Sequence, residues 1–326
     1  GQRVVFEVRA SERQQSRVDI AFRDRAAATI RVLTGEAHGS PFDWSRQPDI
    51  SDDGQVVVFS SASATLVPAV DANGRQEDVY SLQLATGLIA RESTTSAGVQ
   101  PAAGVSYLPS VSSDGRFIAF ASTAALDDEQ PSRGDDDLHQ VFVRDRSART
   151  TTRISRTPRG RPAAGDSTMP SISADGRYVA FSSDGGNIID GDRNRARDVF
   201  LVDRTTMATI LVSRAAVGGA GNGVSLSPVI SADGRFVVFQ SDASNLVCAS
   251  RCPAGQSDVN LLWDVFLFDR VTGTIARMSE DELGGWMEWS AGPAVDGTGR
   301  AVAFSSRHPT DALDQRHDLD LFIRKR

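Results

Sequence analysis

Apolar and polar positions alternate in a block that recurs along the chain. Five copies begin with proline and place two apolar runs on either side of a turn: PDISDDGQVVVFSS (48–61), PSVSSDGRFIAFAS (109–122), PSISADGRYVAFSS (170–183), PVISADGRFVVFQS (228–241) and PAVDGTGRAVAFSS (293–306). A headless copy, GQRVVFEV, occupies residues 1–8. The turn glycine, such as Gly176, supplies the positive φ that a tight hairpin needs, and the Val, Ile and Phe flanks favour strands. Each block therefore predicts two antiparallel strands, A and B.

A second block follows each first block. Its copies are DIAFRDR (19–25), DVYSLQL (78–84), QVFVRDR (140–146), DVFLVDR (198–204), DVFLFDR (264–270) and DLFIRKR (320–326). It predicts strand C, and a run after the next polar turn, such as ILVS at 210–213, predicts strand D. Four antiparallel strands make a propeller blade, and blades bury their faces by stacking on one another. The predicted fold is all-β, a six-bladed β-propeller of four-stranded antiparallel blades.

The whole chain is expected to be one propeller, because no segment is left for a second domain. The blades are expected at about 1–34, 44–93, 105–155, 166–213, 224–279 and 289–326. The first blade lacks strand A and the last lacks strand D, so both are incomplete. We expect a segment of roughly 15–30 residues before Gly1 to supply the two missing strands, because open sheet edges are a liability.

The repeated lines PxISxDGRxVAFxS and DVFVxDR resemble the bacterial WD40-like, or PD40, β-propeller repeat of TolB-like proteins. The resemblance covers essentially the whole chain and concerns the fold, since propellers have many unrelated functions. It implies a six-bladed protein that is exported to the periplasm or cell surface and binds other proteins. The N-terminal α/β domain of TolB has no counterpart here, so no partner-binding residue is transferred.

Composition narrows the function classes. The net charge of −7, with both signs well mixed, argues against a general nucleic-acid binder. No apolar stretch approaches the length of a transmembrane segment. Cys248 and Cys252 lie in one long connection, where a disulfide would suit an oxidising compartment. A metal site is the alternative, but two thiolates without a nearby histidine are a poor zinc set.

The two ends of the blades differ in chemistry. The A–B turns carry Arg116, Arg177, Arg235 and Arg300, and strand C often ends in Asp, as at Asp145, Asp203 and Asp269. Their repetition predicts structural Arg–Asp pairs. The opposite end collects acidic B–C loops and the aromatic residues. The predicted partner-binding residues there are Trp44, Trp263, Trp286, Trp289, Phe42 and Met287. The alternative is that these tryptophans pack over the blade ends.

Three B–C loops contain Asp-x-Asn followed by an Asp at the start of strand C. The best calcium candidate is the fourth blade, with Asp190, Asp192, Asn194 and Asp198. Alternating oxygen ligands in a short loop suit Ca²⁺. Asx turns that satisfy the loop backbone explain the same residues without a metal. No cofactor is therefore required, and calcium is the ion these loops would take.

No catalytic motif emerges. A serine recurs three residues before the proline of strand A, as at Ser45 and Ser167, which suits hydrogen bonding at strand entry better than nucleophilic catalysis. The four histidines share no metal-like or triad-like spacing. The sequence favours a non-enzymatic, exported scaffold that binds a protein partner. The alternatives are a calcium-assisted carbohydrate-binding module or glycan-active enzyme on the same face, and a passive spacer.

Overall fold

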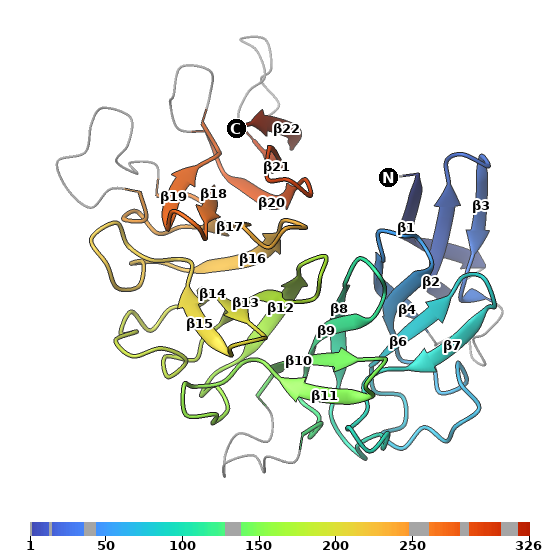
Figure 1. Ribbon diagram of the computed structural model, residues 1–326. Helices are drawn as coiled ribbons and strands as arrows, with labels where there is room; N and C mark the ends of the chain where they lie inside the picture. The colour runs from blue at the N-terminus through green and yellow to red at the C-terminus, as the bar shows by residue number, and fades with distance from the viewer. Residues whose placement is uncertain are drawn as a thin grey trace. The chain divides into compact units, whose positions relative to one another are not determined.

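The computed structural model describes residues 2–12, 15–35, 44–127, 138–247, 261–280, 287–307 and 319–326. These residues contain no α-helix and form six antiparallel sheets in chain order (Figure 1). The first and last sheets have three strands and the other four have four strands. The predicted fold class, an all-β six-bladed propeller with incomplete first and last blades, is confirmed.

Residues Gly1–Ser155 and Ala174–Gly176 form one compact unit, called unit 1, which contains blades 1 to 3. Its strands are β1 (Arg3–Glu12), β2 (Gln15–Asp24) and β3 (Thr29–Val32) in blade 1, β4 (Ser45–Ile50), β5 (Val56–Ser61), β6 (Asp78–Gln83) and β7 (Leu88–Arg91) in blade 2, and β8 (Ser106–Val111), β9 (Phe117–Ser122), β10 (Gln140–Asp145) and β11 (Thr150–Arg153) in blade 3. Blade 1 begins with strands B and C, since β1 pairs with β2.

Residues Arg156–Ser173 and Arg177–Arg326 form the second compact unit, called unit 2, which contains blades 4 to 6. Its strands are β12 (Ser167–Ile172), β13 (Tyr178–Ser183), β14 (Asp198–Asp203) and β15 (Ala208–Leu211) in blade 4, β16 (Ser225–Ile230), β17 (Phe236–Ser241), β18 (Asp264–Asp269) and β19 (Thr274–Arg277) in blade 5, and β20 (Ser290–Val295), β21 (Ala301–Ser306) and β22 (Asp320–Lys325) in blade 6.

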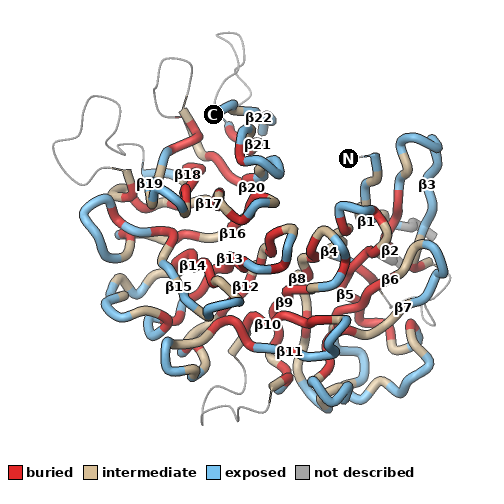
Figure 2. The backbone as a smooth tube through the Cα atoms, viewed as in Figure 1, coloured by how far each residue is buried: buried red, intermediate tan, exposed pale blue. Residues whose placement is uncertain are grey.

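The core lies along the second and third strands of the complete blades, which are buried over almost their whole length (Figure 2). In blades 2 to 6, opposite aromatic rings on strands B and C stack with centroids 5.8–6.2 Å apart. The pairs are Phe59–Tyr80, Phe120–Phe142, Phe181–Phe200, Phe239–Phe266 and Phe304–Phe322. Apolar clusters then join neighbouring blades inside each unit, so each blade is stabilised by the next.

Two kinds of buried hydroxyl contact repeat between strands. The serine that opens strand A meets the serine that closes strand B at 2.8–3.1 Å in five blades, as in Ser45–Ser61 and Ser167–Ser183. The predicted structural role of these serines is confirmed. A second serine, after strand D, donates to the first carboxylate of strand C, as Ser93 does to Asp78 at 2.7 Å.

Strand A contains a bulge that the repeat does not reveal. The residue before the proline has a left-handed backbone in blades 2 to 5, at Gln47, Leu108, Met169 and Ser227, with φ of 53–55°. The strand register shifts at this point, between Arg46 and Asp49 in blade 2 for example. Such a conformation costs roughly 1–2 kcal/mol for a residue with a Cβ. The surrounding blade therefore imposes it.

The predicted Arg–Asp pairs are confirmed in three blades. Bidentate contacts join Arg116 to Asp145, Arg177 to Asp203 and Arg235 to Asp269, each with a closest distance of 2.7 Å. The Arg235 guanidinium lowers the pKa of the Asp269 carboxyl to about 2. These pairs join the A–B turn to the end of strand C, which is a framework role.

A buried carboxylate in blade 2 holds two arginines of blade 3. The Glu92 side chain lies 2.8 Å from Arg146 Nε and 3.8 Å from Arg144 Nε. Arg144 is buried, and its Nη1 donates to the carbonyl oxygens of Thr95 and Arg149. Burial lowers the pKa of Arg144, and the Glu92 charge opposes that shift. Neither the repeat nor the composition points to this contact between blades.

Candidate functional site

Two predicted tryptophans come together at one end of unit 2. The carbonyl oxygen of Trp263, just before strand C of blade 5, accepts a 2.7 Å hydrogen bond from the backbone N–H of Ser290. Trp289 directly precedes Ser290, so it enters blade 6 beside Trp263. Both tryptophans are half-buried. This main-chain hydrogen bond, which Ser106 and Ser225 also make at their blade junctions, places the backbones of Trp263 and Trp289 at the junction of blades 5 and 6.

An arginine lies over the ring of each of the two described tryptophans that precede strand A, Trp44 and Trp289. In unit 1, Arg46 Cζ lies 3.6 Å from the centroid of the Trp44 ring. In unit 2, Arg307 Cζ lies 5.5 Å from the centroid of the Trp289 ring. A guanidinium over an indole face contributes about 0.5–2 kcal/mol and holds the ring in place. Trp44 and Trp289 are thus covered by an arginine on one face and remain half-buried. Partial exposure fits the predicted partner-binding surface, and partial burial fits the alternative of packing over the blade ends.

Apolar residues that sequence reasoning missed extend the Trp263 group. Leu261 and Leu262 immediately precede Trp263, with 71% and 40% of their surface exposed. The sequence does contain a signal for these leucines, because three consecutive large apolar residues in a polar connection predict an exposed apolar run. In unit 1, the rings of Tyr107 and His139 meet edge to face with centroids 5.4 Å apart. We call Leu261, Leu262, Trp263 and Trp289 the tryptophan surface of unit 2.

Met287 does not belong to this surface. Its side chain is 2% exposed and packs with Phe236, Val302 and Phe304 between blades 5 and 6. The expectation that Met287 adds exposed apolar area is corrected, because the apolar side chain fills space between two sheets. Phe42, Trp286, Cys248 and Cys252 lie outside the described residues, so their predicted roles stay predictions.

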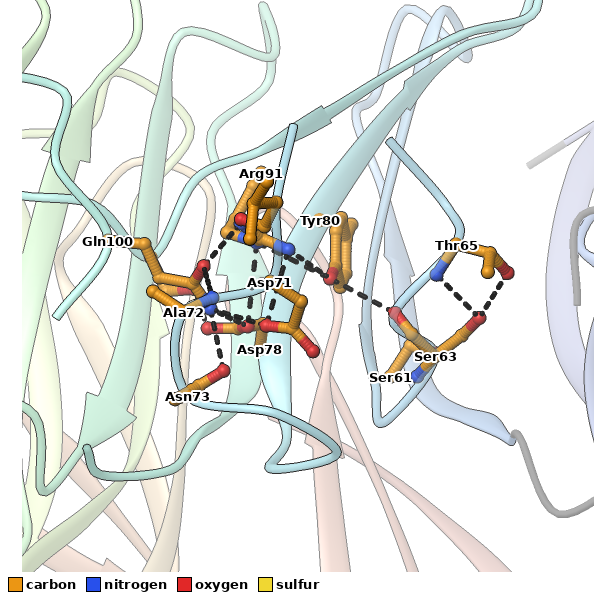
Figure 3. Close-up of polar contacts among 12 residues, drawn as sticks. Ser61, Ser63, Thr65, Asp71, Ala72, Asn73, Asp78, Tyr80, Arg91 and Gln100 are labelled. Atoms are coloured by element: carbon orange, nitrogen blue, oxygen red, sulfur yellow. Dashed lines mark hydrogen bonds and ion pairs between the residues drawn. The ribbon is translucent and has the colours of Figure 1, made fainter. Parts of the chain in front are cut away.

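The B–C loop of blade 2 forms a dense polar cluster (Figure 3). The Gln100 side-chain amide nitrogen lies 2.8 Å from Asp71 Oδ1, 2.6 Å from Asn73 Oδ1 and 2.7 Å from Asp78 Oδ2. Arg91, the last residue of β7, adds its guanidinium at 3.4 Å from Asp78 and 3.5 Å from Asp71. One of the three predicted calcium-type loops therefore has its acidic ligands satisfied by the protein's own nitrogen donors.

Burial dominates the electrostatics of this cluster. It raises the pKa of Asp78 to about 6, against the opposing hydrogen bond from Ser93 and the charge of Arg91. It also raises the pKa of Tyr80 to about 12. The Arg91 guanidinium lies over the Tyr80 ring, 5.6 Å from its centroid. The arrangement ties the loop to strands C and D.

Replacing Gln100 with alanine, the residue that blade 4 has at the corresponding Ala220, is expected to lower the free energy of unfolding by about 1–3 kcal/mol. The change leaves the buried oxygens of Asp71 and Asp78 short of donors. Urea unfolding at pH 7 measures the change in the free energy of unfolding. The exposed neighbour Val99, replaced by alanine, serves as control. A Gln100→Ala protein as stable as the control would show that water replaces the amide without loss.

Blade 4 has the same Asp-x-Asn loop pattern, but it has no arginine at the position that Arg91 occupies in blade 2. Leu211 ends β15 where Arg91 ends β7, since each pairs with the third residue of its strand C. Asp198 is fully buried and accepts from Ser213 and from Asn194 Nδ2 at 2.6 and 2.7 Å. Burial raises the pKa of Asp198 to about 7. Two carboxylates of this loop, Asp192 and Asp198, thus lie near each other with no arginine at the Arg91 position.

The fourth-blade loop does not gather all the predicted calcium ligands. Asn194 Oδ1 accepts the backbone N–H of Ala196 at 2.9 Å, as in an Asx turn, and Asp190 is exposed. Within the described ranges, no three or more His, Cys, Asp or Glu side chains are grouped to hold a metal ion. Calcium binding therefore stays a prediction.

Some of the carboxylates that were predicted to lie on the surface at the loop end of the blades are buried. Asp78, Asp198 and Asp264, which open strand C in three blades, are 0–3% exposed. Each accepts a hydrogen bond from the serine after strand D. These carboxylates are internal groups that fix strand C to strand D, so only the loop residues before them contribute negative charge to the surface.

Among the described residues, no helix is long and apolar enough to cross a membrane.

Comparison with solved structures identifies the fold. TolB from Acinetobacter baumannii matches with a TM-score of 0.55 and 15% identity, over 99% of this chain and 61% of that chain. An acylaminoacyl peptidase from Pyrococcus horikoshii matches with a TM-score of 0.57 and 10% identity, over 100% of this chain and 43% of that chain. An oligogalacturonate lyase in complex with manganese matches with a TM-score of 0.52 and 11% identity, over 98% of this chain and 73% of that chain.

These matches concern the fold, because all three are below 25% identity. No family model matches the chain, and no curated protein matches it in sequence. The chain spans 61% of the length of the TolB chain. The match with TolB covers 99% of this chain, so the chain has a six-bladed β-propeller fold similar to that of TolB.

Proposed function

We propose that the protein is a non-enzymatic, exported β-propeller that binds a protein partner through the B–C and D–A connections of its blades. The observation that carries the proposal is the tryptophan surface of unit 2. The backbones of Trp263 and Trp289 meet at the junction of blades 5 and 6, and Leu261 and Leu262, which directly precede Trp263, expose apolar area. Tryptophan is enriched among the residues that dominate protein–protein affinity.

The geometry suits binding better than simple end-packing. A Trp that served only to seal the blade end would leave little apolar surface, whereas Leu261 is 71% exposed beside it. The Arg307 stack holds Trp289 before a partner arrives, which reduces the entropy lost on binding. The exposed leucines beside Trp263 fit a partner segment with an apolar anchor.

The structural neighbours support a scaffold role and define its rivals. TolB is among them, and so are peptidases and a lyase, so the fold alone favours neither binding nor catalysis. Export to the periplasm or cell surface belongs to the proposal and rests on the PD40-type repeat and on the predicted disulfide.

The test compares the parent with a Trp263→Ala/Trp289→Ala variant. A partner is captured from native envelope extract, purified, and titrated against both proteins by calorimetry. We expect at least a tenfold loss of affinity in the variant, as for paired interface tryptophans. Leu88→Ala, which removes an exposed leucine at the C–D turn of blade 2, is the control and should bind like the parent. Equal affinity for all three proteins contradicts the proposal.

The alternative function is carbohydrate binding assisted by a divalent cation. One structural neighbour, an oligogalacturonate lyase, was solved in complex with manganese. In that case the tryptophans would stack on sugar rings, and the Asp192–Asp198 pair of blade 4 would take a divalent cation. Competition by free oligosaccharides together with loss of binding in chelator would favour this alternative. Retention of the protein partner in chelator would favour the scaffold.

A further inference from the structure

A cavity of about 420 Å³ lies inside unit 2, between blade 4 and blade 5. Its lining comes from the crossover after β15, from the first part of the B–C connection of blade 5, and from the turn and strand residues at the start of β19. A volume of this size is within the range of small-ligand sites. The cavity shares no residue with the tryptophan surface of unit 2.

The corresponding junction between blades 2 and 3 of unit 1 is closed by a serine. The Ser96 hydroxyl donates to the carbonyl oxygen of Thr151 at 3.4 Å and accepts the N–H of Thr151 at 3.0 Å. In unit 2, Ala216 lies five residues after the end of β15, as Ser96 does after the end of β7. Ile275 is the second residue of β19, as Thr151 is of β11. Because Ala216 has no hydroxyl, the closing contact is missing here.

The main chain of Ile275 faces away from the rest of its sheet. The N–H of Met278 donates to the carbonyl oxygen of Val265 at 2.7 Å, and hydrogen-bonded pairs alternate with non-hydrogen-bonded pairs along β18 and β19. Ile275 and Phe268 are therefore a non-hydrogen-bonded pair, so the N–H and C=O of Ile275 point to the outer edge of β19. In the part of the chain that the structure describes, no other residue hydrogen-bonds to these two groups.

Arg214 gives the cavity a positive charge that no carboxylate neutralises among the described residues. A Cβ at Gly273 would lie 2.7 Å from Arg214 Nη2, and Arg214 Cζ is 5.6 Å from the centroid of the Phe268 ring. Much of the remaining lining is apolar, since Leu246 is buried and Ile275 packs against the same core cluster. The cavity thus combines a guanidinium, a main-chain donor and acceptor, and apolar side chains.

We propose that this cavity binds the free carboxyl terminus of an extended peptide whose last residue is apolar. The N–H of that residue donates to the carbonyl oxygen of Ile275, and its carboxylate accepts the N–H of Ile275 and pairs with Arg214. Its side chain packs against Leu246 and Val247. Main-chain pairing at a strand edge and capture of a terminal carboxylate are both known modes of peptide recognition.

The donor and acceptor of Ile275 favour a peptide terminus over a simple anion. A phosphate or sulfate ion satisfies the guanidinium of Arg214 and the N–H of Ile275, but it offers no donor of its own to the Ile275 carbonyl oxygen. A terminal residue supplies an N–H and a carboxylate at the spacing of one residue, which matches the two main-chain groups of Ile275. The proposal does not depend on the proposed function.

The probe is the tripeptide acetyl-Gly-Ala-Leu with a free carboxylate, and the matched control is the same peptide as its carboxamide. Both are titrated into the isotopically labelled protein, residues 1–326, and followed by two-dimensional NMR, which measures affinity and position together. We expect saturable binding of the carboxylate peptide with a shift of the Ile275 amide signal. The carboxamide should bind about tenfold more weakly, because the charge-assisted pair with Arg214 is lost.

Three variants test the residues that carry the proposal. Arg214→Gln should lower the affinity for the carboxylate peptide to that for the carboxamide, which should be unchanged. Arg159→Gln changes an exposed arginine in the crossover before blade 4 and should bind both peptides like the parent. Ala216→Ser introduces the hydroxyl that Ser96 uses in unit 1, so it should close the edge of β19 and weaken the binding of both peptides. Each variant must first melt like the parent.

The outcomes separate a peptide site from its rivals. Absence of saturable binding, equal affinity for the two peptides, or binding that leaves the Ile275 signal in place would each overturn the proposal. Displacement of the peptide by an equal concentration of inorganic phosphate would show a general anion site, and a peptide ligand would be wrong. The Trp263→Ala/Trp289→Ala variant should bind the carboxylate peptide normally, so this result is independent of the partner-capture test.

Discussion

Replacing Glu92 with alanine is expected to lower the free energy of unfolding of unit 1 by about 3–5 kcal/mol. The side chains of Glu92 and Arg144 are 7% and 8% exposed, so the variant leaves a guanidinium buried without its carboxylate. Arg144 is fixed there by its bonds to the carbonyl oxygens of Thr95 and Arg149, and it cannot move to water without breaking them. Urea unfolding followed by tryptophan fluorescence and by far-ultraviolet circular dichroism measures the loss.

Two further variants separate the buried charge from other effects. Arg146→Ala removes the more exposed partner of Glu92 and should cost less, about 1 kcal/mol, because the Glu92–Arg144 pair survives. Replacing Glu92 and Arg144 together with the apolar residues that blade 4 has there, Val212 and Val202, should restore most of the stability. If the double variant is as unstable as Glu92→Ala, the cause is lost packing and the electrostatic explanation fails.

Raising the pH from 5 to 8 is expected to destabilise the protein, and Asp198→Asn is expected to remove most of the contribution from blade 4. Burial raises the pKa of Asp198 from 3.8 in the unfolded chain to about 7 in the fold. Between these values the folded state holds the proton more tightly, so the free energy of unfolding falls as the pH rises through about 7. The contribution is on the order of 2–4 kcal/mol at pH 8.

Other carboxyl groups also make the stability depend on pH, either between pH 5 and 8 or outside that range. The pKa of Asp78 and that of Asp49 are both raised to about 6, so the parent should lose some stability with rising pH even without Asp198. The pKa of Asp269 is lowered to about 2, and its stabilising effect is complete above pH 4. The measurement is the unfolding midpoint in urea at pH 5, 6, 7 and 8, with a chelator present.

Asp198→Asn should be more stable than the parent at pH 8, and the difference should shrink as the pH falls toward 4. Asparagine can keep the contacts to Ser213 and Asn194 with its amide suitably turned. Asp190→Asn, which changes an exposed carboxylate of the same loop, is the control and should keep the slope of the parent. A parent whose stability is flat from pH 5 to 8 would contradict the burial argument. Recovery by added calcium would show that the loop takes a cation instead of a proton.

Much of the chemistry near the blade ends could not be predicted from the sequence. Asp78 and Asp198 look like surface loop acids, because each follows a polar loop, yet both are buried at the start of strand C. Met287 follows Trp286 and precedes Trp289 in a polar connection, yet it fills space between two blades. The two carboxylates are covered through contacts with residues after strand D of their own blade, and Met287 through contacts with Phe236 of blade 5. A local pattern carries no record of these contacts.

The sequence by itself determined the number of blades, the strands of each blade and the missing strands of the first and last. The period-two alternation and the Asp-Gly turns are local features, and local sterics and hairpin geometry suffice to read them. The recurring serines and the Arg–Asp pairs could also be predicted, because a contact that recurs in several blades leaves a repeated pattern in the sequence. The tertiary structure decided contacts that the repeat does not encode: the Glu92–Arg144 contact between blades 2 and 3, and the burial of Met287 between blades 5 and 6. Each depends on residues distant in sequence that only stacked sheets bring together.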